Sequence, residues 1–288
     1  MKLNHLFERE KPTFSLEIFP PKKDSAIEGI YRTLEELTEI KPDFISVTYG
    51  AGGGEAGATT CELASHIKHQ LGIEPLAHFT CVNSTRRQVL DNLRRLEEHD
   101  IENVLALRGD LNEDTPLHAD FAHASDLAAL IHENSGMNLA GACYPEGHYE
   151  NKNLDEDIAN LRYKLEAGVT HLITQLFFDN AKFYTFIDKL RAAGIAAPVE
   201  AGVMPIVTTR QIERTVALSG ASLPTEFTHM VSRYSQNPEA LYHAGIAYAI
   251  EQCCELLQNG AQGIHLYTMN NAKVAKAVYE GIKAELGQ

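Results

Sequence analysis

The chain has few cysteines, few basic residues and no long apolar run. Its five cysteines form no C-x-x-C pair, which argues against a disulfide framework or a zinc ribbon and favours a reducing compartment. Lysine and arginine number 25 against 39 acidic residues, and the net charge of -14 opposes binding to nucleic acid or to an anionic membrane surface. No apolar run approaches the roughly 18 residues of a membrane span, and the first residues are too polar for a signal sequence. We therefore expect a cytoplasmic protein.

Several motifs of well-known enzyme classes are also missing. The sequence contains no G-x-x-x-x-G-K-[ST], no H-E-x-x-H and no G-x-S-x-G, so the phosphate loop of NTPases, the zincin metal site and the hydrolase nucleophile elbow are not expected. Its 13 histidines are scattered and form no compact ligand array. We expect no metal site.

Short β-rich runs alternate with helical patterns along the whole chain. The eight runs occupy residues 13–19, 44–49, 75–80, 103–107, 139–144, 172–178, 199–204 and 263–267. This alternation is typical of parallel strands joined by helical crossovers, and eight units in 288 residues predict an α/β fold, a single-domain (β/α)8 TIM barrel. An open doubly wound sheet is the alternative, but it usually has fewer strands. Since no linker divides the chain, residues 1–288 are expected to form one catalytic domain.

Two helical patterns are well defined. Residues 85–99 place apolar side chains on one stripe, with Ser84 as the expected N-cap, and residues 155–167 repeat the pattern before Gly168, a stop signal. Extra helices are expected between the seventh and eighth strands, because the interval is too long for one crossover.

Chemistry in such a barrel takes place at the carboxyl ends of the strands, and polar residues gather there. They are Glu17, Thr48, Tyr49, His78, Thr80, Arg108, Asp110, Tyr144, His148, Gln175 and Tyr267. The predicted strand ends carry no lysine that could form a Schiff base. The carboxyl end of the barrel, its mouth, thus carries acids and aromatic residues but no metal motif or nucleophile. This suggests that a bound organic cofactor provides the reactive group.

Glu17 is the most informative of these residues. Its side chain should point into the barrel, where an ionised carboxylate is costly unless paired. We expect a raised pKa and a catalytic role for Glu17, and the alternative is a structural ion pair with Arg108. Gln175 interrupts an apolar run, where an amide can orient a ligand or can simply be satisfied by the backbone.

Two further sets of polar residues are only weak evidence for a binding site when each is taken by itself. Arg108, Gly109 and Asp110 form a turn that combines a planar donor fork with a fixed negative charge, although such turns are common on surfaces. One face of a predicted helix carries Asp157, Asn160 and Lys164. Without other information, that face is read as solvated.

A G-x-G-x-x-G pattern occurs at Gly52, Gly54 and Gly57. A dinucleotide fingerprint would also need an acid at the end of the next strand, but Glu74 precedes that strand. We interpret the segment as a substrate-facing loop.

A family resemblance appears when the motifs are taken together. SLEIFPPK, FISVTYGAGG, LAHFTC, NVLALRGD, ACYPEGH, DIANLRYK and ITQLFFD resemble, in order and spacing, methylenetetrahydrofolate reductase of the bacterial type, and the match runs from about Phe14 onward. The resemblance implies a (β/α)8 barrel that holds FAD non-covalently and reduces 5,10-methylenetetrahydrofolate to 5-methyltetrahydrofolate with NADH. It also implies ping-pong hydride transfer through flavin N5, a supply of methyl groups for methionine synthesis, a homotetramer and no carboxyl-terminal regulatory domain.

The resemblance also implies roles for particular residues. FAD would be contacted by Thr48, His78, Arg108, Gly109, Asp110, Ala124, Tyr144, His148, Asp157, Asn160 and Lys164. Asp157, Asn160 and Lys164 are then read as ribityl and diphosphate ligands. Glu17 would be the general acid, and Asp110 would act beside the flavin as the second catalytic residue. Folate or nicotinamide would be faced by Asp110, Gln175, Gln211 and Tyr267.

The chain departs from the family pattern at three positions. Tyr163 and Asn271 stand where arginines can occur, and Thr215 stands where a ligand-stacking phenylalanine can occur. Asn271 leaves the folate glutamate tail without its usual cation. Two other functions stay open on sequence grounds, namely a different flavin-dependent barrel such as an amino-acid dehydrogenase, and a non-catalytic module that binds flavin or folate.

Overall fold

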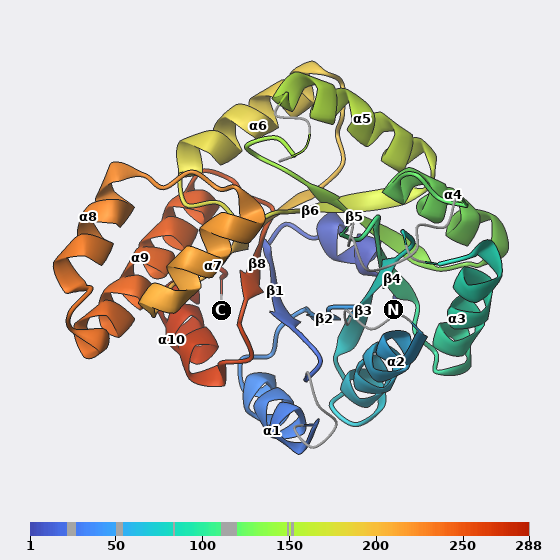
Figure 1. Ribbon diagram of the computed structural model, residues 1–288, viewed down its shortest axis with the longest axis horizontal. Helices are drawn as coiled ribbons and strands as arrows, with labels where there is room; N and C mark the ends of the chain where they lie inside the picture. Colours follow the sequence, from blue (N-terminus) through green and yellow to red (C-terminus); the bar gives the residue numbers. More distant parts are fainter. Residues whose placement is uncertain are drawn as a thin grey trace.

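The chain folds into a closed barrel of eight parallel strands surrounded by helices (Figure 1). The computed structural model describes residues 1–21, 27–49, 54–82, 84–110, 120–148, 150 and 153–287. Each strand pairs with the next in chain order, and β8 pairs with β1 to close the barrel. The predicted TIM barrel is confirmed.

The strands lie close to their predicted positions, with one shift. They are β1 (Thr13–Ile18), β2 (Phe44–Val47), β3 (Glu74–Thr80), β4 (Asn103–Leu107), β5 (Asn138–Cys143), β6 (Val169–Thr174), β7 (Val199–Val203) and β8 (Gly263–Tyr267). The expected sixth strand, residues 172–178, was placed too late. Its last residues are apolar because Phe177 stacks on Phe183 of a helix and Phe178 stacks on Phe227 of another, and neither pairs in the sheet. Gln175 therefore follows β6 at the barrel mouth.

The crossovers are α-helical. They are α1 (Ile27–Thr38), α2 (Gly54–His69), α3 (Arg86–Glu98), α4 (Ala124–Asn134), α5 (Leu154–Glu166), α6 (Asn180–Ala192), α7 (Thr209–Ser219), α8 (Thr225–Tyr234), α9 (Pro238–Gln258) and α10 (Ala272–Ile282). The expected N-cap Ser84 was wrong by one residue. Thr85 caps α3, because its side chain and that of Gln88 each accept the other's backbone N–H in a capping box. Gly168, the expected stop signal, follows α5 and has a positive φ of 100°.

Extra helices lie between β7 and β8, as expected, and they include α8, which was not predicted individually. In Figure 1, α8 lies at the outer edge of the molecule beside α9. Buried side chains of Phe178, Met204, Ile206, Ala221 and Phe227 form a separate apolar cluster that attaches this insertion to the barrel. The insertion thus borders the carboxyl ends of β6 and β7.

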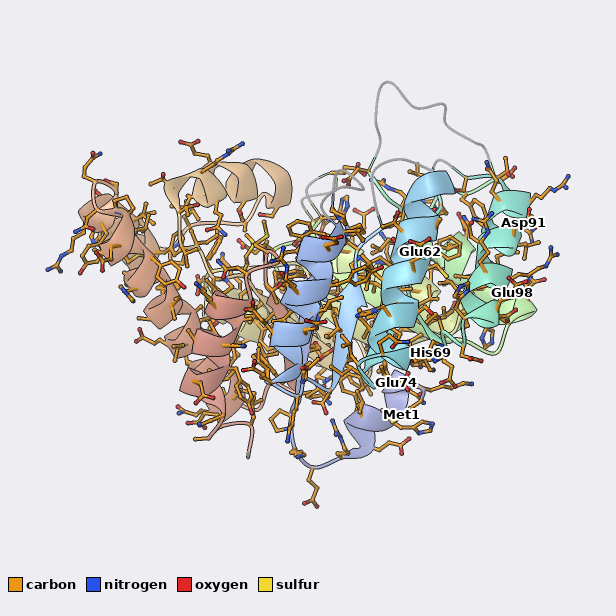
Figure 2. The ribbon with its side chains drawn as sticks, turned by 90° about the horizontal axis from the view of Figure 1, so that it is seen from below. Met1, Glu62, His69, Glu74, Asp91 and Glu98 are labelled. Atoms are coloured by element: carbon orange, nitrogen blue, oxygen red, sulfur yellow. The ribbon has the colours of Figure 1, made fainter. Side chains whose placement is uncertain are left out.

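The opposite end of the barrel is closed by the short 3-10 helix η1 (Leu3–Glu8). Leu3 and Leu6 pack there against inward-facing residues of the strands. The amino group of Met1 forms ion pairs with Glu74 and Glu102, and Figure 2 shows Met1 and Glu74 together at this end. Because the amino ends of the strands are closed in this way, the carboxyl ends form the open mouth.

Gly245 packs so closely against the neighbouring backbone that a larger residue there should destabilise the fold. In α9, a Cβ on Gly245 would lie 1.8 Å from the carbonyl oxygen of Ile206, so alanine cannot enter without moving backbone. We expect Gly245→Ala to lower the free energy of unfolding by about 1–3 kcal/mol or more, as measured by urea denaturation. Gly29 of α1 has open space around it, and Gly29→Ala is the matched control, expected to be neutral or stabilising by up to about 1 kcal/mol. Equal effects at the two positions would contradict the packing described here.

Candidate active site at the barrel mouth

Glu17 lies at the centre of a polar cluster made by four strands. On β1, alternation turns Thr13, Ser15 and Glu17 to the same side of the strand, and all three make polar contacts inside the barrel. Glu17 Oε2 lies 3.3 Å from His78 Nε2 of β3 and 3.4 Å from His265 Nε2 of β8. Ser46 of β2 donates to the same oxygen over 3.4 Å. The Glu17 side chain is 16% exposed, so it is reached from the mouth but largely enclosed.

The expected raised pKa of Glu17 is wrong. Burial does raise the pKa of this carboxyl, but the hydrogen bond with His265 and the charge of His78 outweigh burial and hold the pKa at about 2. The alternative ion pair with Arg108 is also not formed. Arg108 instead makes two hydrogen bonds of 2.7 Å each with the carboxylate of Glu150. Glu17 is therefore an ionised group between two imidazoles.

This low pKa predicts how acid affects stability. The folded-state pKa lies below the ordinary value of 4.5, so the Glu17 contacts contribute stability that is complete above that value and is lost as the pH falls toward about 2. Between about pH 5 and pH 3, we expect the wild-type protein to lose more unfolding free energy than Glu17→Gln, which has no such carboxylate. Urea midpoints of both proteins at the two pH values measure the difference. Equal losses would mean that Glu17 is not stabilised as an anion.

A second cluster, which we call the cationic cluster, consists of Arg108, Tyr144, His148, Asp157 and Lys164. The backbone N–H of His148 donates to the Asp157 carboxylate, and the Tyr144 ring packs edge-on against the His148 imidazole with centroids 4.7 Å apart. Lys164 donates to the carbonyl oxygen of Ala142 over 2.7 Å, and burial lowers the pKa of its amine. Arg108 and Lys164 both act electrostatically on His148, so the structure brings together residues from the loops after β4 and β5 and from α5.

Gly109 lies in a tight turn directly after Arg108. It has φ of 90°, and a Cβ there would lie 3.1 Å from side-chain carbons of Thr80 and Val82. The backbone N–H groups of Cys81 and Val82 donate to the Arg108 carbonyl, which ties the ends of β3 and β4 together. A side chain at position 109 would strain this turn and crowd Thr80 and Val82, so the close packing of the two strand ends requires glycine.

The other expected site residues are placed as follows. Thr48 directly follows β2, and its carbonyl accepts from Thr60. Ala124 is buried at the start of α4, Asp110 is exposed after β4, and Asn160 is exposed on α5. Tyr267 donates to the Thr174 carbonyl over 2.7 Å, and its ring fills the space left by Gly202.

The side-chain amides of Gln175 and Gln211 already form hydrogen bonds with the nearby backbone. Gln175 Oε1 accepts from the N–H of Leu176, and Gln211 Oε1 accepts from the N–H groups of Val207 and Thr208 at the start of α7. Gln211 therefore acts as a cap for α7 in this structure. Only the amide NH₂ groups and the free lone pairs of these side chains could serve a ligand.

The departures from the family pattern have local explanations in two cases. Tyr163 is 63% exposed on α5, and Asn271 caps α10 by accepting from the N–H of Val274. Thr215 is buried in α7, and nothing in the structure explains it further. Of the glycine pattern, Gly52 lies outside the described residues, and Gly54 begins α2.

Sequence reasoning missed several polar residues inside the barrel, three of which lie near Glu17 or in line with it. Ser46, Glu200 and His265 are fully buried, and His265 contacts Glu17 directly. Signals for two of them were present, because Glu200 interrupts an apolar strand and His265 alternates with Gly263 and Tyr267 on β8. Over the described ranges, the structure contains no group of three or more potential metal ligands, and none of the described helices could cross a membrane.

Comparison with known proteins now decides the family. The model of the family "Methylenetetrahydrofolate reductase" matches residues 2–283. The chain belongs to the methylenetetrahydrofolate reductase family. The 5,10-methylenetetrahydrofolate reductase of Pectobacterium carotovorum is 31% identical over 264 residues, which cover 92% of this chain and 88% of that protein. Methylenetetrahydrofolate reductase 1 of Schizosaccharomyces pombe is 33% identical over 285 residues, covering 97% of this chain and 47% of that protein, so the chain spans about half the length of that yeast reductase.

Solved structures agree on the fold. An uncharacterized protein from Clostridium thermocellum, which binds two copies of 5-methyl-5,6,7,8-tetrahydrofolic acid, superposes with a TM-score of 0.66 at 14% identity, and the match covers 100% of both chains. A dihydropteroate synthase from Coxiella burnetii in complex with pteroic acid gives a TM-score of 0.53 at 12% identity over 96% of this chain and 94% of that chain. At such identities, the similarity concerns the barrel alone.

Proposed function

We propose that this member of the methylenetetrahydrofolate reductase family binds FAD at the barrel mouth and uses NADH to reduce 5,10-methylenetetrahydrofolate to 5-methyltetrahydrofolate. The observation that carries the proposal is that the Glu17 cluster and the cationic cluster adjoin. Tyr267 of β8 is the register partner of Glu17 on β1, and its hydroxyl donates to the carbonyl of Thr174, which pairs with Cys143 at the end of β5, directly before Tyr144. An acid-base group and two basic side chains, those of Arg108 and Lys164, therefore lie at one mouth.

The donor set of the cationic cluster fits FAD. Lys164 is an enclosed amine whose burial lowers its pKa, so a neighbouring diphosphate would stabilise its charged form. Arg108 carries a planar fork, which Glu150 occupies in this structure and which a diphosphate could take over in its place. The diphosphate and ribityl groups are assigned to Asp157, Asn160 and Lys164, and the remaining contacts to Thr48, His78, Arg108, Gly109, Asp110, Ala124, Tyr144 and His148. When bound, FAD supplies hydride transfer from NADH and then to the folate at one site.

Glu17 is proposed to handle the proton of this reaction. Protonation of folate N10 opens the imidazolidine ring to a 5-iminium cation, whose methylene carbon is then reduced. General acid catalysis of this kind typically contributes about 10²–10⁴-fold in rate. Because the pKa of Glu17 is about 2, the carboxylate must take up a proton before it can act as the acid. Asp110 would stabilise the iminium cation by its negative charge, and Gln175, Gln211 and Tyr267 would face folate or nicotinamide.

We also propose a metabolic role and an oligomeric state for the enzyme. The product would supply methyl groups for methionine synthesis in the cytoplasm, and the enzyme would assemble as a homotetramer. Size-exclusion chromatography with light scattering tests the assembly directly.

Product analysis tests the proposed activity. Purified protein should be yellow and should release FAD on denaturation, and with NADH and methylenetetrahydrofolate it should form 5-methyltetrahydrofolate, identified by chromatography. A protein that passes hydride to a cyclic imino acid instead would be an amino-acid type of dehydrogenase. A yellow protein that NADH does not bleach would be a non-catalytic binding module. Either result would refute the proposed function.

A further inference from the structure

A column of buried polar groups continues below Glu17 into the barrel. Ser15 Oγ lies 2.7 Å from His265 Nδ1, on the far side of the imidazole from Glu17. The same hydroxyl lies 3.0 Å from Glu200 Oε1, and Thr13 Oγ1 lies 2.7 Å from that oxygen. Glu17 and Glu200 are therefore linked through Ser15 and His265, and each link is within hydrogen-bond distance or close to it.

Glu200 is a carboxyl group in an unusual position. It is fully buried on β7, and its Oε2 has no hydrogen-bond partner among the described residues. The barrel makes room for it at Gly263 of β8, where a Cβ would lie 3.0 Å from Glu200 Cγ and 1.9 Å from the Thr13 hydroxyl. A buried carboxylate with one unpartnered oxygen has a high free energy because its charge has lost its hydration. The neutral carboxylic acid loses much less on burial. In agreement, burial raises the pKa of Glu200.

The surrounding charges do not remove this preference. The titratable groups that face the column are Asp43 from the segment before β2, His78 from β3, His171 from β6, and His265 and Tyr267 from β8. His265 and the hydrogen bonds from Thr13 and Ser15 lower the pKa of Glu200, while the negative charge of Asp43 raises it further. Burial is the largest of these effects, so the protonated form of Glu200 is favoured deep in the barrel, whereas the ionised form of Glu17 is favoured at the mouth.

Building on the proposed function, we propose that Glu200 stores the proton that Glu17 delivers to folate, and that Ser15 and His265 pass it between the two carboxyls. Glu200 touches no substrate and acts through these groups, so it is a positioning residue for the proton.

The transfer balances without any other reactant. The O–H bond of Glu200 breaks as its proton joins Ser15 Oγ, the Ser15 proton moves to His265 Nδ1, and the proton on His265 Nε2 moves to Glu17. The net charge of the set is unchanged, because Glu200 becomes a carboxylate as Glu17 becomes an acid. A substrate that covers Glu17 favours the transfer, since excluding water destabilises the Glu17 anion. After N10 takes the proton, the open mouth supplies one proton from water and the column returns to its first state.

Infrared spectroscopy tests where the proton is stored. At neutral pH, the wild-type protein should show the C=O stretch of a protonated carboxylic acid, sensitive to heavy water, and this band should be absent in Glu200→Gln. Glutamine keeps the size of the side chain and can donate to Ser15 and accept from Thr13, but it has no acidic proton to release. A wild-type protein without a band that Glu200→Gln removes would overturn the proposal. This measurement needs neither flavin nor folate.

Single-turnover kinetics test the transfer. In Glu200→Gln, we expect reoxidation of the NADH-reduced enzyme by methylenetetrahydrofolate to slow by about 10²-fold, the lower end of a typical general-acid contribution, with bleaching by NADH unchanged. Reoxidation within twofold of wild type would overturn the proposal. Wild-type protein that folate does not reoxidise would refute the proposed function instead, and the infrared result would still decide the position of the proton.

A matched pair of variants covers the case in which Glu200→Gln does not fold. Ser15→Ala and Thr13→Val each remove one hydroxyl from Glu200 Oε1, but only Ser15 also contacts His265. Ser15→Ala should keep the infrared band and lose folate reduction by a similar factor, whereas Thr13→Val should reduce folate within a few-fold of wild type. Equal rates in the two variants would show that the contact between Ser15 and His265 carries no proton.

Discussion

Glu17→Gln is expected to slow folate reduction by about 10²–10⁴-fold while leaving flavin content and NADH oxidation unchanged. Glutamine keeps the shape of the side chain beside His78 and His265, but it cannot carry a proton to N10. The loss should lie in the rate of the step and not in folate affinity, because the proton is transferred in the transition state. Anaerobic stopped-flow absorbance of the two half-reactions measures both effects.

A second carboxyl at the mouth provides the control for this experiment. Glu146, on the loop after β5, accepts hydrogen bonds from the backbone and hydroxyl of Ser222 and does not contact the Glu17 cluster. Glu146→Gln should reduce folate at close to the wild-type rate. If Glu17→Gln also reduces folate as fast as wild type, Glu17 has no part in the reaction.

Lys164→Met is expected to weaken FAD binding by about 10–100-fold, which corresponds to the loss of one charge-assisted hydrogen bond of about 1.5–3 kcal/mol. Methionine keeps the length of the apolar stem and removes the buried charge that would meet the diphosphate. Titration of the apoprotein with FAD, followed by quenching of flavin fluorescence, gives both dissociation constants.

The exposed Lys182 of α6 is the matched control, and Lys182→Met should bind FAD like the wild type. Lys164 also donates to the Ala142 carbonyl, so some loss of stability is expected in Lys164→Met. Unchanged FAD affinity together with a lowered melting temperature would show that Lys164 only supports β5.

The barrel was predictable because its signals are local. Apolar runs of strand length alternate with amphipathic helices. Only β6 was predicted at the wrong position, because Phe177 and Phe178 are apolar residues that pack against helices and not in the sheet. The N-cap of α3 moved by one residue because Ser84 and Thr85 are both good caps, and only the Gln88 contact selects Thr85. Such choices depend on side-chain contacts that composition does not reveal.

The cationic cluster was predictable for a different reason. Its residues stand at positions that match the motifs of the family, so the resemblance alone implied that they lie close together. The protonation state of Glu17 was not predictable, because it depends on β1, β3 and β8 converging on one oxygen. Alternation along β1 fixes the direction of the side chain, but it says nothing about which imidazoles meet it. For the same reason, the link from Glu17 to Glu200 is visible only in three dimensions.

The central claim is that one mouth holds a flavin, a proton-delivering carboxyl and a folate in turn. Its most direct test is an anaerobic single-turnover experiment on the purified, flavin-loaded protein. NADH should bleach the visible flavin band, and methylenetetrahydrofolate, added after excess NADH is removed, should restore it with one equivalent of 5-methyltetrahydrofolate per flavin. A colourless protein that FAD does not reconstitute, or a bleached band that methylenetetrahydrofolate leaves unchanged, would contradict the account.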